Sequence, residues 1–295
     1  MTTMFVFLLF IVGACHGMPL HADNLQNFCE NLLKKDNIKG CIIVYDIKND
    51  KIKAVTSPNI AFKNYYPMGS VFKIVTAFAL YDEKIINNST RVNCKNYYKI
   101  QNKDYICSKP GGHGEVNLSK AIAYSCSVYF YNFYGKFCRG TLQCAPTDYA
   151  RLLLDDKHNK CKIKEPKDLS GLADMSAGEG GFVLIRPVQM INLIKHLTKE
   201  DIKVDKKYYI AVKEGMKLSA ENGTSQRAGI NIAGKTGTPA DIKRKNKFHG
   251  WFIGWTPAKN PETAVVVFLE DGKGYEAAEI AGKILKQTTE KTERN

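Results

Sequence analysis

A serine and a lysine stand three residues apart in the segment Ser70-Val-Phe-Lys73. The apolar spacing over residues 70–81 predicts a helix that Ser70 opens, so the two side chains would share one face, one turn apart. Such an amine can activate the hydroxyl for acyl transfer if burial or a nearby cation lowers the pKa of Lys73. The spacing alone is weak evidence, because an N-cap serine followed by a surface lysine gives the same pattern.

A second pair of hydroxyls occurs in Ser125-Cys-Ser127, within residues 118–134, which we also predict to be helical. Both hydroxyls could reach the same cleft as Ser70. Ser125 would then be placed to pass a proton to a leaving amine.

A third group, Lys235-Thr236-Gly237-Thr238, ends a predicted strand over residues 230–236. The lysine and the hydroxyls suit a substrate carboxylate, and a glycine leaves room for an extended peptide beside the strand. We therefore predict that Lys235, Thr236, Gly237 and Thr238 bind substrate.

The elements that must position these groups follow one another in a simple order. Two short β-rich runs joined by turn residues predict a hairpin, and a helical block, three antiparallel strands and a last helix come after it. This order predicts an α+β fold in which an antiparallel sheet is flanked by helices, with a separate helical lobe. The expected ranges are 41–46 and 51–55 for the hairpin, 187–197 for a third helix, 250–255 and 264–269 for the later strands, and 277–285 for the last helix.

The chain of 295 residues is divided here into four segments. Residues 1–22 are predicted to be a signal peptide or short membrane anchor, 23–39 an N-terminal extension, 40–287 one catalytic domain and 288–295 a polar tail. The apolar run over 4–14 is too short to span a bilayer as a helix and suits export, so we expect a periplasmic or membrane-associated protein. Cys15 follows two small residues and is a candidate lipidation site.

The formal net charge of +14 arises from 43 basic and 29 acidic residues scattered along the chain. No nucleic-acid-binding signature accompanies this charge, so we expect no nucleic-acid partner. A basic surface beside anionic lipids or an acidic wall polymer explains it equally well.

Taken together, Ser-x-x-Lys, a middle serine motif and Lys-Thr-Gly form the set found in β-lactamases and penicillin-binding proteins. Over about residues 40–285 the sequence resembles the transpeptidase domain of class B penicillin-binding proteins, most closely the elongation-type members. The stretches that carry the resemblance are Tyr66-Pro-Met-Gly-Ser-Val-Phe-Lys73, Gly112-His-Gly-Glu-Val-Asn-Leu118, Tyr124-Ser-Cys-Ser-Val-Tyr-Phe-Tyr131, Arg186-Pro-Val-Gln189 and His249-Gly-Trp-Phe-Ile-Gly254.

The resemblance implies a serine D,D-transpeptidase or D,D-carboxypeptidase that acts on peptidoglycan stem peptides and is acylated by β-lactams, with no cofactor in catalysis. It implies that Ser70 is the nucleophile, that Lys73 takes its proton and that Ser125 relays a proton to the leaving group. The backbone amides of Ser70 and Thr238 would form the oxyanion hole. Ser127 is also predicted to bind substrate, although it departs from the family, which usually has Asn or Asp there.

Four residues before and within the middle motif offer three sulfurs and one imidazole, which match a closed tetrahedral zinc site. Some elongation-type relatives carry a structural zinc at matching positions. A disulfide between Cys94 and Cys107 is the alternative, natural in an oxidising compartment. Cys138 and Cys144 could form a further local bridge. The candidate zinc ligands are Cys94, Cys107, His113 and Cys126.

Two other functions remain open. A β-lactamase of class D character would share the Ser70 and Lys73 motif but would hydrolyse its acyl-enzyme quickly. A sensor that binds β-lactams or muropeptides would be acylated without turnover. Glu165 invites comparison with the deacylating glutamate of class A β-lactamases, but its surroundings indicate a solvated loop acid.

Overall fold

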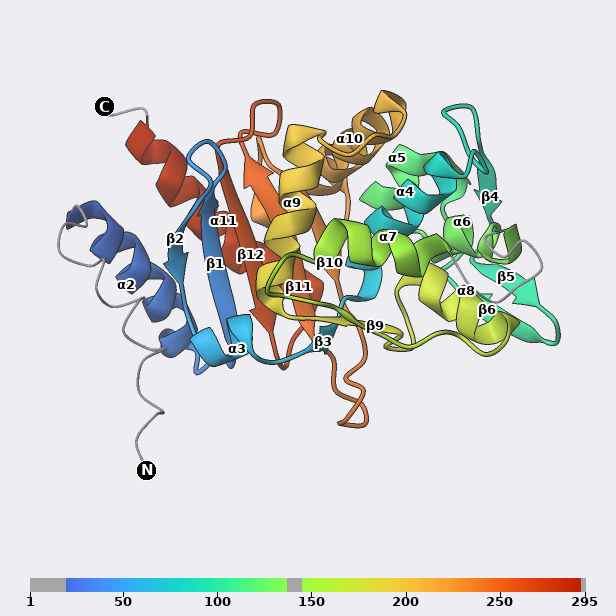
Figure 1. The fold of residues 1–295 in the computed structure, drawn as a ribbon, viewed down its shortest axis with the longest axis horizontal. Helices are drawn as coiled ribbons and strands as arrows, with labels where there is room; N and C mark the ends of the chain where they lie inside the picture. Colours follow the sequence, from blue (N-terminus) through green and yellow to red (C-terminus); the bar gives the residue numbers. More distant parts are fainter. Residues whose placement is uncertain (1–19, 137–144, 293–295) are drawn as a thin grey trace.

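The structure is a computed structural model that describes residues 20–136 and 145–292. Figure 1 shows a sheet with covering helices at one end of the molecule and a cluster of helices at the other. The two lobes meet along the last strands of the sheet and α4, so the predicted α+β architecture with a helical lobe is confirmed. Residues 1–19, including Cys15, and Cys138 and Cys144 lie outside the described residues.

The main sheet has five antiparallel strands in the order β10-β11-β12-β1-β2. The predicted hairpin is present, and the three later strands pair as expected. The strands are β1 (Gly40–Asp46), β2 (Lys51–Val55), β10 (Ala233–Gly237), β11 (Gly250–Thr256) and β12 (Thr263–Leu269).

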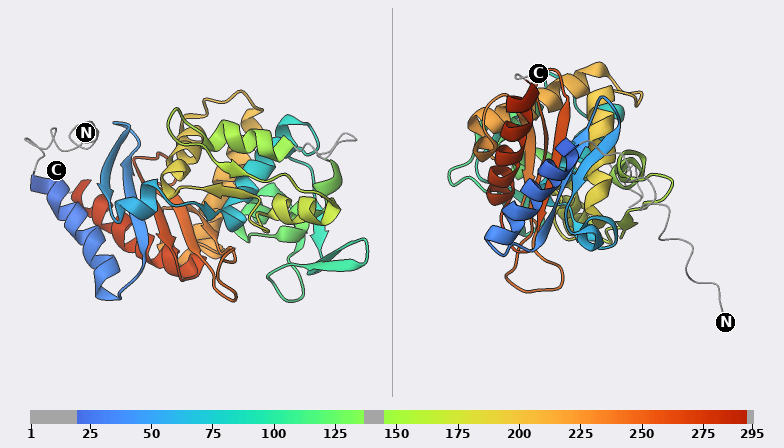
Figure 2. Two further views of the ribbon diagram at one scale, coloured as in Figure 1. Left: turned by 60° about the horizontal axis from the view of Figure 1, so that its bottom comes forward. Right: turned by 90° about the vertical axis from the view of Figure 1, so that its left-hand side faces the viewer.

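Both faces of this sheet are buried. Alternate residues along a strand point to opposite sides, and in β1 both sets of side chains are buried. In β1, Cys41, Ile43 and Tyr45 join the core shared with the helical lobe and α9 (Met190–Lys199). Ile42 and Val44 face the other way, toward α2 (Leu20–Lys35) and α11 (Gly274–Thr292). Figure 2 shows these two helices side by side at the end of the molecule away from the helical lobe.

The segment 23–39, predicted as an extension, is therefore largely α2, and its Cys29 and Leu33 are buried in this second core. Among the described residues, none of the helices has the length and apolar composition needed to cross a membrane.

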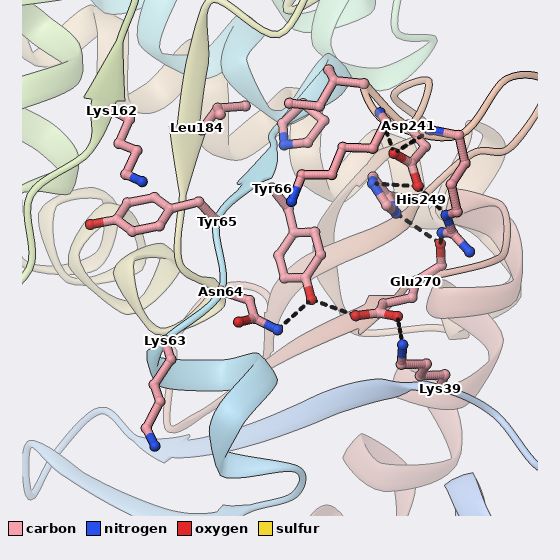
Figure 3. Close-up of a pocket in the computed structure, with 14 residues that line it drawn as sticks. Lys39, Lys63, Asn64, Tyr65, Tyr66, Lys162, Leu184, Asp241, His249 and Glu270 are labelled. Carbon is pink, nitrogen blue, oxygen red and sulfur yellow. Dashed lines mark hydrogen bonds and ion pairs between the residues drawn. The ribbon is translucent and has the colours of Figure 1, made fainter.

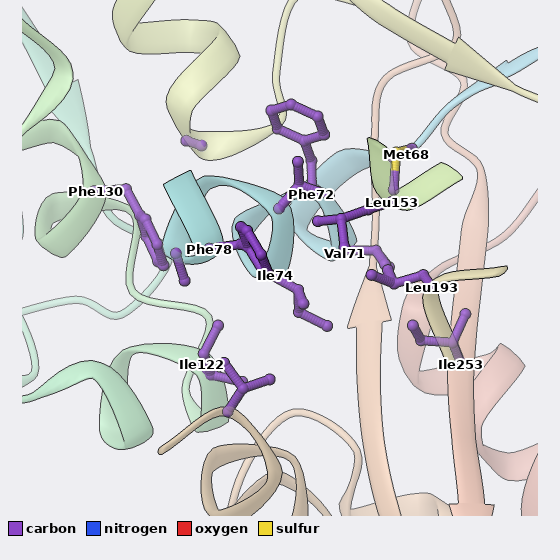
Figure 4. Packing of buried hydrophobic residues seen from close by; sticks show 14 of the residues in the cluster. Met68, Val71, Phe72, Ile74, Phe78, Ile122, Phe130, Leu153, Leu193 and Ile253 are labelled. Carbon is purple, nitrogen blue, oxygen red and sulfur yellow. The ribbon is translucent and has the colours of Figure 1, made fainter. Parts of the chain in front are cut away.

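The helical lobe is built around α4 (Lys73–Asp82), which is buried on nearly every side. Figure 4 shows Phe72, Ile74 and Phe78 packed among side chains from several neighbouring helices. A helix that is apolar on all sides is stable only in the interior, so the nearly continuous apolar sequence after Ser70 accounts for the burial of α4. The other helices of the lobe are α5 (Leu118–Ala123), α6 (Ser127–Tyr131), α7 (Ala145–Leu154), α8 (Leu169–Ala177) and α10 (Lys206–Asn222).

Short elements complete the chain. A three-stranded sheet combines β3 (Tyr66–Pro67), β9 (Val183–Ile185) and β8 (Lys162–Ile163). Two small ribbons pair β4 (Val92–Cys94) with β7 (Gly114–Val116) and β5 (Tyr97–Ile100) with β6 (Lys103–Ile106). The remaining helical turns are α3 (Pro58–Phe62) and the 3-10 turns η1 (Gly69–Phe72), η2 (Tyr134–Lys136), η3 (Pro187–Gln189) and η4 (Gln226–Ala228).

The helix predicted over residues 118–134 is wrong in its middle, because the chain leaves the helix at Ser125 and begins α6 at Ser127. The strand predicted over 230–236 starts three residues later, at Ala233. Ile230 lies in the preceding turn and is 89% exposed, so its apolar side chain does not contribute to the sheet.

Candidate active site

Ser70 lies in the 3-10 turn that opens α4, and its hydroxyl is close to the amine of Lys73. Lys73 Nζ donates a hydrogen bond of 2.7 Å to Ser70 Oγ, as the three-residue spacing predicts. The lysine side chain is fully buried, so the amine cannot be hydrated as a surface lysine would be. The pair therefore has the geometry of a hydroxyl beside a proton acceptor.

Two glycines, Gly178 and Gly237, allow neighbouring backbone to approach the turn that carries Ser70 closely from two sides. An added Cβ on Gly178, at the end of α8, would lie 2.0 Å from the carbonyl oxygen of Gly69. An added Cβ on Gly237, at the end of β10, would lie 2.7 Å from the carbonyl oxygen of Met68. Backbone from α8 and from β10 thus touches the nucleophile turn directly and fixes its position.

Ser125 stands where α5 ends, in a backbone conformation that serines rarely adopt. Its φ is 55°, and the amides of Ser125 and Cys126 donate to the carbonyls of Ile122 (3.3 Å) and Ala121 (2.9 Å). These two bonds form a Schellman ending, a position that usually takes glycine. The backbone of Ser125 is therefore strained, and its hydroxyl lines the same cavity as Ser70.

β10 brings Lys235 to the same place. Lys235 Nζ donates one hydrogen bond of 3.0 Å to Ser125 Oγ and another of 2.8 Å to the backbone carbonyl oxygen of the next residue, Thr236. Thr236 Oγ1 donates to Thr224 Oγ1 at 2.7 Å, and Thr224 follows α10. Three segments distant in sequence therefore meet, as the sequence interpretation required.

These groups line one cavity of about 670 Å³. Thr238 and Gly237 line it beyond Lys235, and Ser127 and Tyr131 line it as well. The predicted nucleophile, middle serines and strand residues thus all lie in or against this cavity, with Lys73 and Lys235 behind its wall.

Burial dominates the electrostatics of both lysines. It lowers the pKa of Lys73, and the negative charge of Glu179 opposes this in part. Burial, followed by the positive charge of Lys73, holds the pKa of Lys235 well below the usual lysine value. A lysine whose pKa is lowered in this way can exist as the neutral amine that a general base requires.

Sequence reasoning missed several residues that line the cavity, among them Glu179 and Thr224. Glu179 lies between Gly178 and Gly180, both of which have positive φ, and this run of glycines around a single acid was the available signal. Glu165, by contrast, is a loop acid whose side chain is 47% exposed and 4.0 Å from Arg151, in agreement with its interpretation as a solvated residue.

The four predicted metal ligands also converge. Their donor atoms all lie within 4.8 Å of one another, so the cluster could hold a metal ion. Cys94 and Cys107 are free thiols, and the alternative disulfide between them is not formed in this structure. Cys107 also lines the active-site cavity, and Cys126 lies between the two serines of the middle motif.

A second cavity, of about 540 Å³, is lined by β3 and the loop after β10 (Figure 3). Its acids are already engaged, since Glu270 bonds both Lys39 and the hydroxyl of Tyr66 at 2.6 Å, and Asp241 pairs with Arg244 at 2.5 Å. No serine, threonine or cysteine appears among the described residues that line it. This network anchors Tyr66, four residues before Ser70.

The sequence matches the family described as penicillin binding protein transpeptidase domain over residues 40–290. The peptidoglycan D,D-transpeptidase MrdA of Acinetobacter baumannii is 26% identical over 287 residues, which cover 76% of this chain and 42% of that protein. MrdA of Haemophilus influenzae is 24% identical over 356 residues, covering 88% of this chain and 54% of that protein. This chain thus spans about half the length of the curated relatives it matches.

Two solved structures have a similar fold. PBP2 of Pseudomonas aeruginosa, in complex with WCK 5153, has a TM-score of 0.76 and 21% identity, covering 91% of this chain and 76% of that one. PBP2 of Helicobacter pylori has a TM-score of 0.75 and 20% identity, covering 92% of this chain and 63% of that one. The fold and the match over residues 40–290 agree, and the chain belongs to the penicillin-binding protein transpeptidase domain family.

Proposed function

We propose that this protein is a serine D,D-acyltransferase that acts on peptidoglycan stem peptides ending in D-Ala-D-Ala and is acylated by β-lactams. The observation that carries the proposal is the contact of 2.7 Å between Lys73 Nζ and Ser70 Oγ, beside a second contact of 3.0 Å between Lys235 and Ser125. Membership of the family and the resemblance to the MrdA transpeptidases support this activity.

In the proposed acylation, Ser70 Oγ attacks the carbonyl carbon of the penultimate D-Ala while Lys73 takes the hydroxyl proton. The bond to the terminal D-Ala breaks, and Ser125 delivers a proton to its amine. The hydrogen bond from Lys235 to Ser125 supports this relay, because it links a buried proton donor to the hydroxyl that faces the leaving group. The product is an ester on Ser70 and free D-Ala.

We propose that Lys235, Thr236 and Thr238 hold the substrate carboxylate and that Gly237 admits the substrate backbone beside β10. A carboxylate bound beside Lys235 would favour the protonated form of its buried amine, and a charged amine next to hydroxyls is a strong carboxylate partner. Ser127 lines the same cavity and is proposed to contact the substrate, with a shorter side chain than the Asn or Asp usual in the family. The backbone amides of Ser70 and Thr238 are proposed as the oxyanion hole.

We also propose that Cys94, Cys107, His113 and Cys126 hold a structural zinc ion. With bond lengths of about 2.3 Å to sulfur and about 2.0–2.1 Å to nitrogen, a tetrahedral site has sulfur–sulfur edges of about 3.8 Å and sulfur–nitrogen edges of about 3.6 Å. Cys107 Sγ lies 3.9 Å from Cys126 Sγ, and His113 Nδ1 lies 3.4 Å from Cys107 Sγ and 3.6 Å from Cys94 Sγ. The donor set therefore fits zinc, which would brace the strained Ser125.

The proposed substrate is a wall polymer, so we propose that the protein acts outside the cytoplasmic membrane, as the prediction of a signal or anchor over residues 1–22 also suggests. Cell fractionation tests this. Recovery only in the cytoplasm would contradict it.

Labelling with a fluorescent penicillin tests the proposed activity. We expect Ser70→Ala to abolish covalent labelling and the exposed matched control Ser89→Ala to label like the parent protein. Equal labelling of Ser70→Ala would show that the nucleophile lies elsewhere. Steady hydrolysis of nitrocefin at a high rate would instead favour a β-lactamase.

A further inference from the structure

Glu179 is an acid in the active-site cavity that the acylation step leaves without a role. It lines the cavity together with Ser70, Ser125 and Thr238, and it follows directly after the glycine that touches the nucleophile turn. Its position is therefore fixed relative to Ser70 by the same close backbone contact that fixes the serine.

The surroundings of Glu179 suit a proton acceptor. Within residues 20–136 and 145–292 its carboxylate has neither a hydrogen bond nor an ion pair, and Lys73 is the opposite charge that acts on it. Burial raises its pKa, the positive charge of Lys73 lowers it, and Asp174 raises it further. A partly buried acid without a bonded partner, facing a cavity, is available to a water molecule or an amine there.

In the part of the chain that the structure describes, the other acids lack this placement. Glu165 is exposed near Arg151, and Asp174, on α8, does not line the cavity. Lys73 beside Ser70 and Glu179 on the same cavity thus offer two different proton acceptors, which matches a reaction with two half-steps.

We propose that Glu179 is the general base of deacylation, the residue that deprotonates the water or amine that attacks the acyl group on Ser70. This inference rests on the proposed acyltransferase function. It adds hydrolysis of the acyl-enzyme, a D,D-carboxypeptidase activity, to transfer onto an amine acceptor.

The step balances as follows. A proton of the attacking water moves to the Glu179 carboxylate while the oxygen bonds to the ester carbonyl carbon. The bond between that carbon and Ser70 Oγ then breaks, and the proton returns through Lys73 to Ser70 Oγ. The products are a free acid and a regenerated serine; with an amine acceptor the product is an amide and the proton path is the same.

The test is a time course of intact mass after benzylpenicillin is added and then removed, for wild type, Glu179→Gln and the exposed control Glu165→Gln. We expect all three to become acylated, and we expect the adduct on Glu179→Gln to persist about 100-fold longer, the scale of a lost general base. Glu179→Asp should give an intermediate lifetime. Hydrolysis of a peptide ending in D-Ala-D-Ala should fall in the same order.

The outcomes separate the two proposals. A lifetime of Glu179→Gln within threefold of wild type would overturn the role of Glu179 alone. Loss of acylation in Glu179→Gln with an unchanged Tm would also overturn it, because the carboxylate would then serve Lys73 in the first half-step. No adduct on wild type would overturn the proposed function itself.

Discussion

Gly178→Ala tests whether backbone contact from α8 fixes the nucleophile. The new Cβ would lie 2.0 Å from the carbonyl oxygen of Gly69, where real contacts stay above 3.0 Å, so one of the two must move by about 1 Å. Because a misplacement of about 1 Å can cost about 10²-fold in rate, we expect acylation by benzylpenicillin to slow by about 100-fold. The variant should also unfold at lower temperature.

The matched control is Gly111→Ala. Gly111 has φ of 79°, close to the 83° of Gly178, but an added Cβ there meets nothing within 4 Å. Both variants lose about 1–2 kcal/mol of stability because alanine is disfavoured in the left-handed backbone conformation. The difference between the two variants in acylation rate and Tm therefore reports the steric clash with Gly69 alone. Acylation is followed by stopped-flow fluorescence and stability by thermal unfolding. If Gly178→Ala acylates within threefold of Gly111→Ala, the proposed role of this contact is refuted.

Three further predictions concern the lysines and the cysteine cluster. Burial lowers the pKa of Lys73, against the opposing charge of Glu179, so the acylation rate should rise with pH as the neutral amine forms, with a midpoint below the ordinary lysine value of 10.5; a midpoint at or above 10.5 in a pH–rate profile would contradict this. Lys235→Met keeps the bulk and removes the amine that donates to Ser125 and to the Thr236 carbonyl, so we expect acylation by benzylpenicillin to fall by about 10²-fold; unimpaired acylation would remove Lys235 from the site. Cys94→Ser should lower zinc content, measured by metal analysis after purification without chelators, and should lower Tm, whereas Cys161→Ser, at a free cysteine outside the cluster, should change neither; equal metal content in both variants would refute the zinc site.

The sheet and the nucleophile helix could be predicted from local patterns. β1, β11 and β12 are continuous apolar runs bounded by turn residues, and the hydrophobic spacing after Ser70 is helical over its whole length. Each signal lies within one segment, and burial on both faces strengthens it. α10 was missed because it has a low apolar content and many lysines, although Tyr208, Val212 and Met216 form a buried stripe along it.

The position of Ser125 could not be predicted in this way. Its neighbours are compatible with a helix, and the left-handed backbone at Ser125 is held by the Schellman bonds and by Lys235, which lies 110 residues later. Likewise, Glu179 belongs to the site only because Gly178 packs against Gly69. Both features depend on contacts between distant segments, which no local pattern encodes.

Peptide mapping by mass spectrometry after reaction with benzylpenicillin tests the central claim most directly. If Lys73 activates the hydroxyl that it contacts at 2.7 Å, close to one equivalent of penicilloyl adduct should be found on the peptide containing Ser70. An adduct on Ser125 or another residue, or a folded protein without any adduct, would contradict the account.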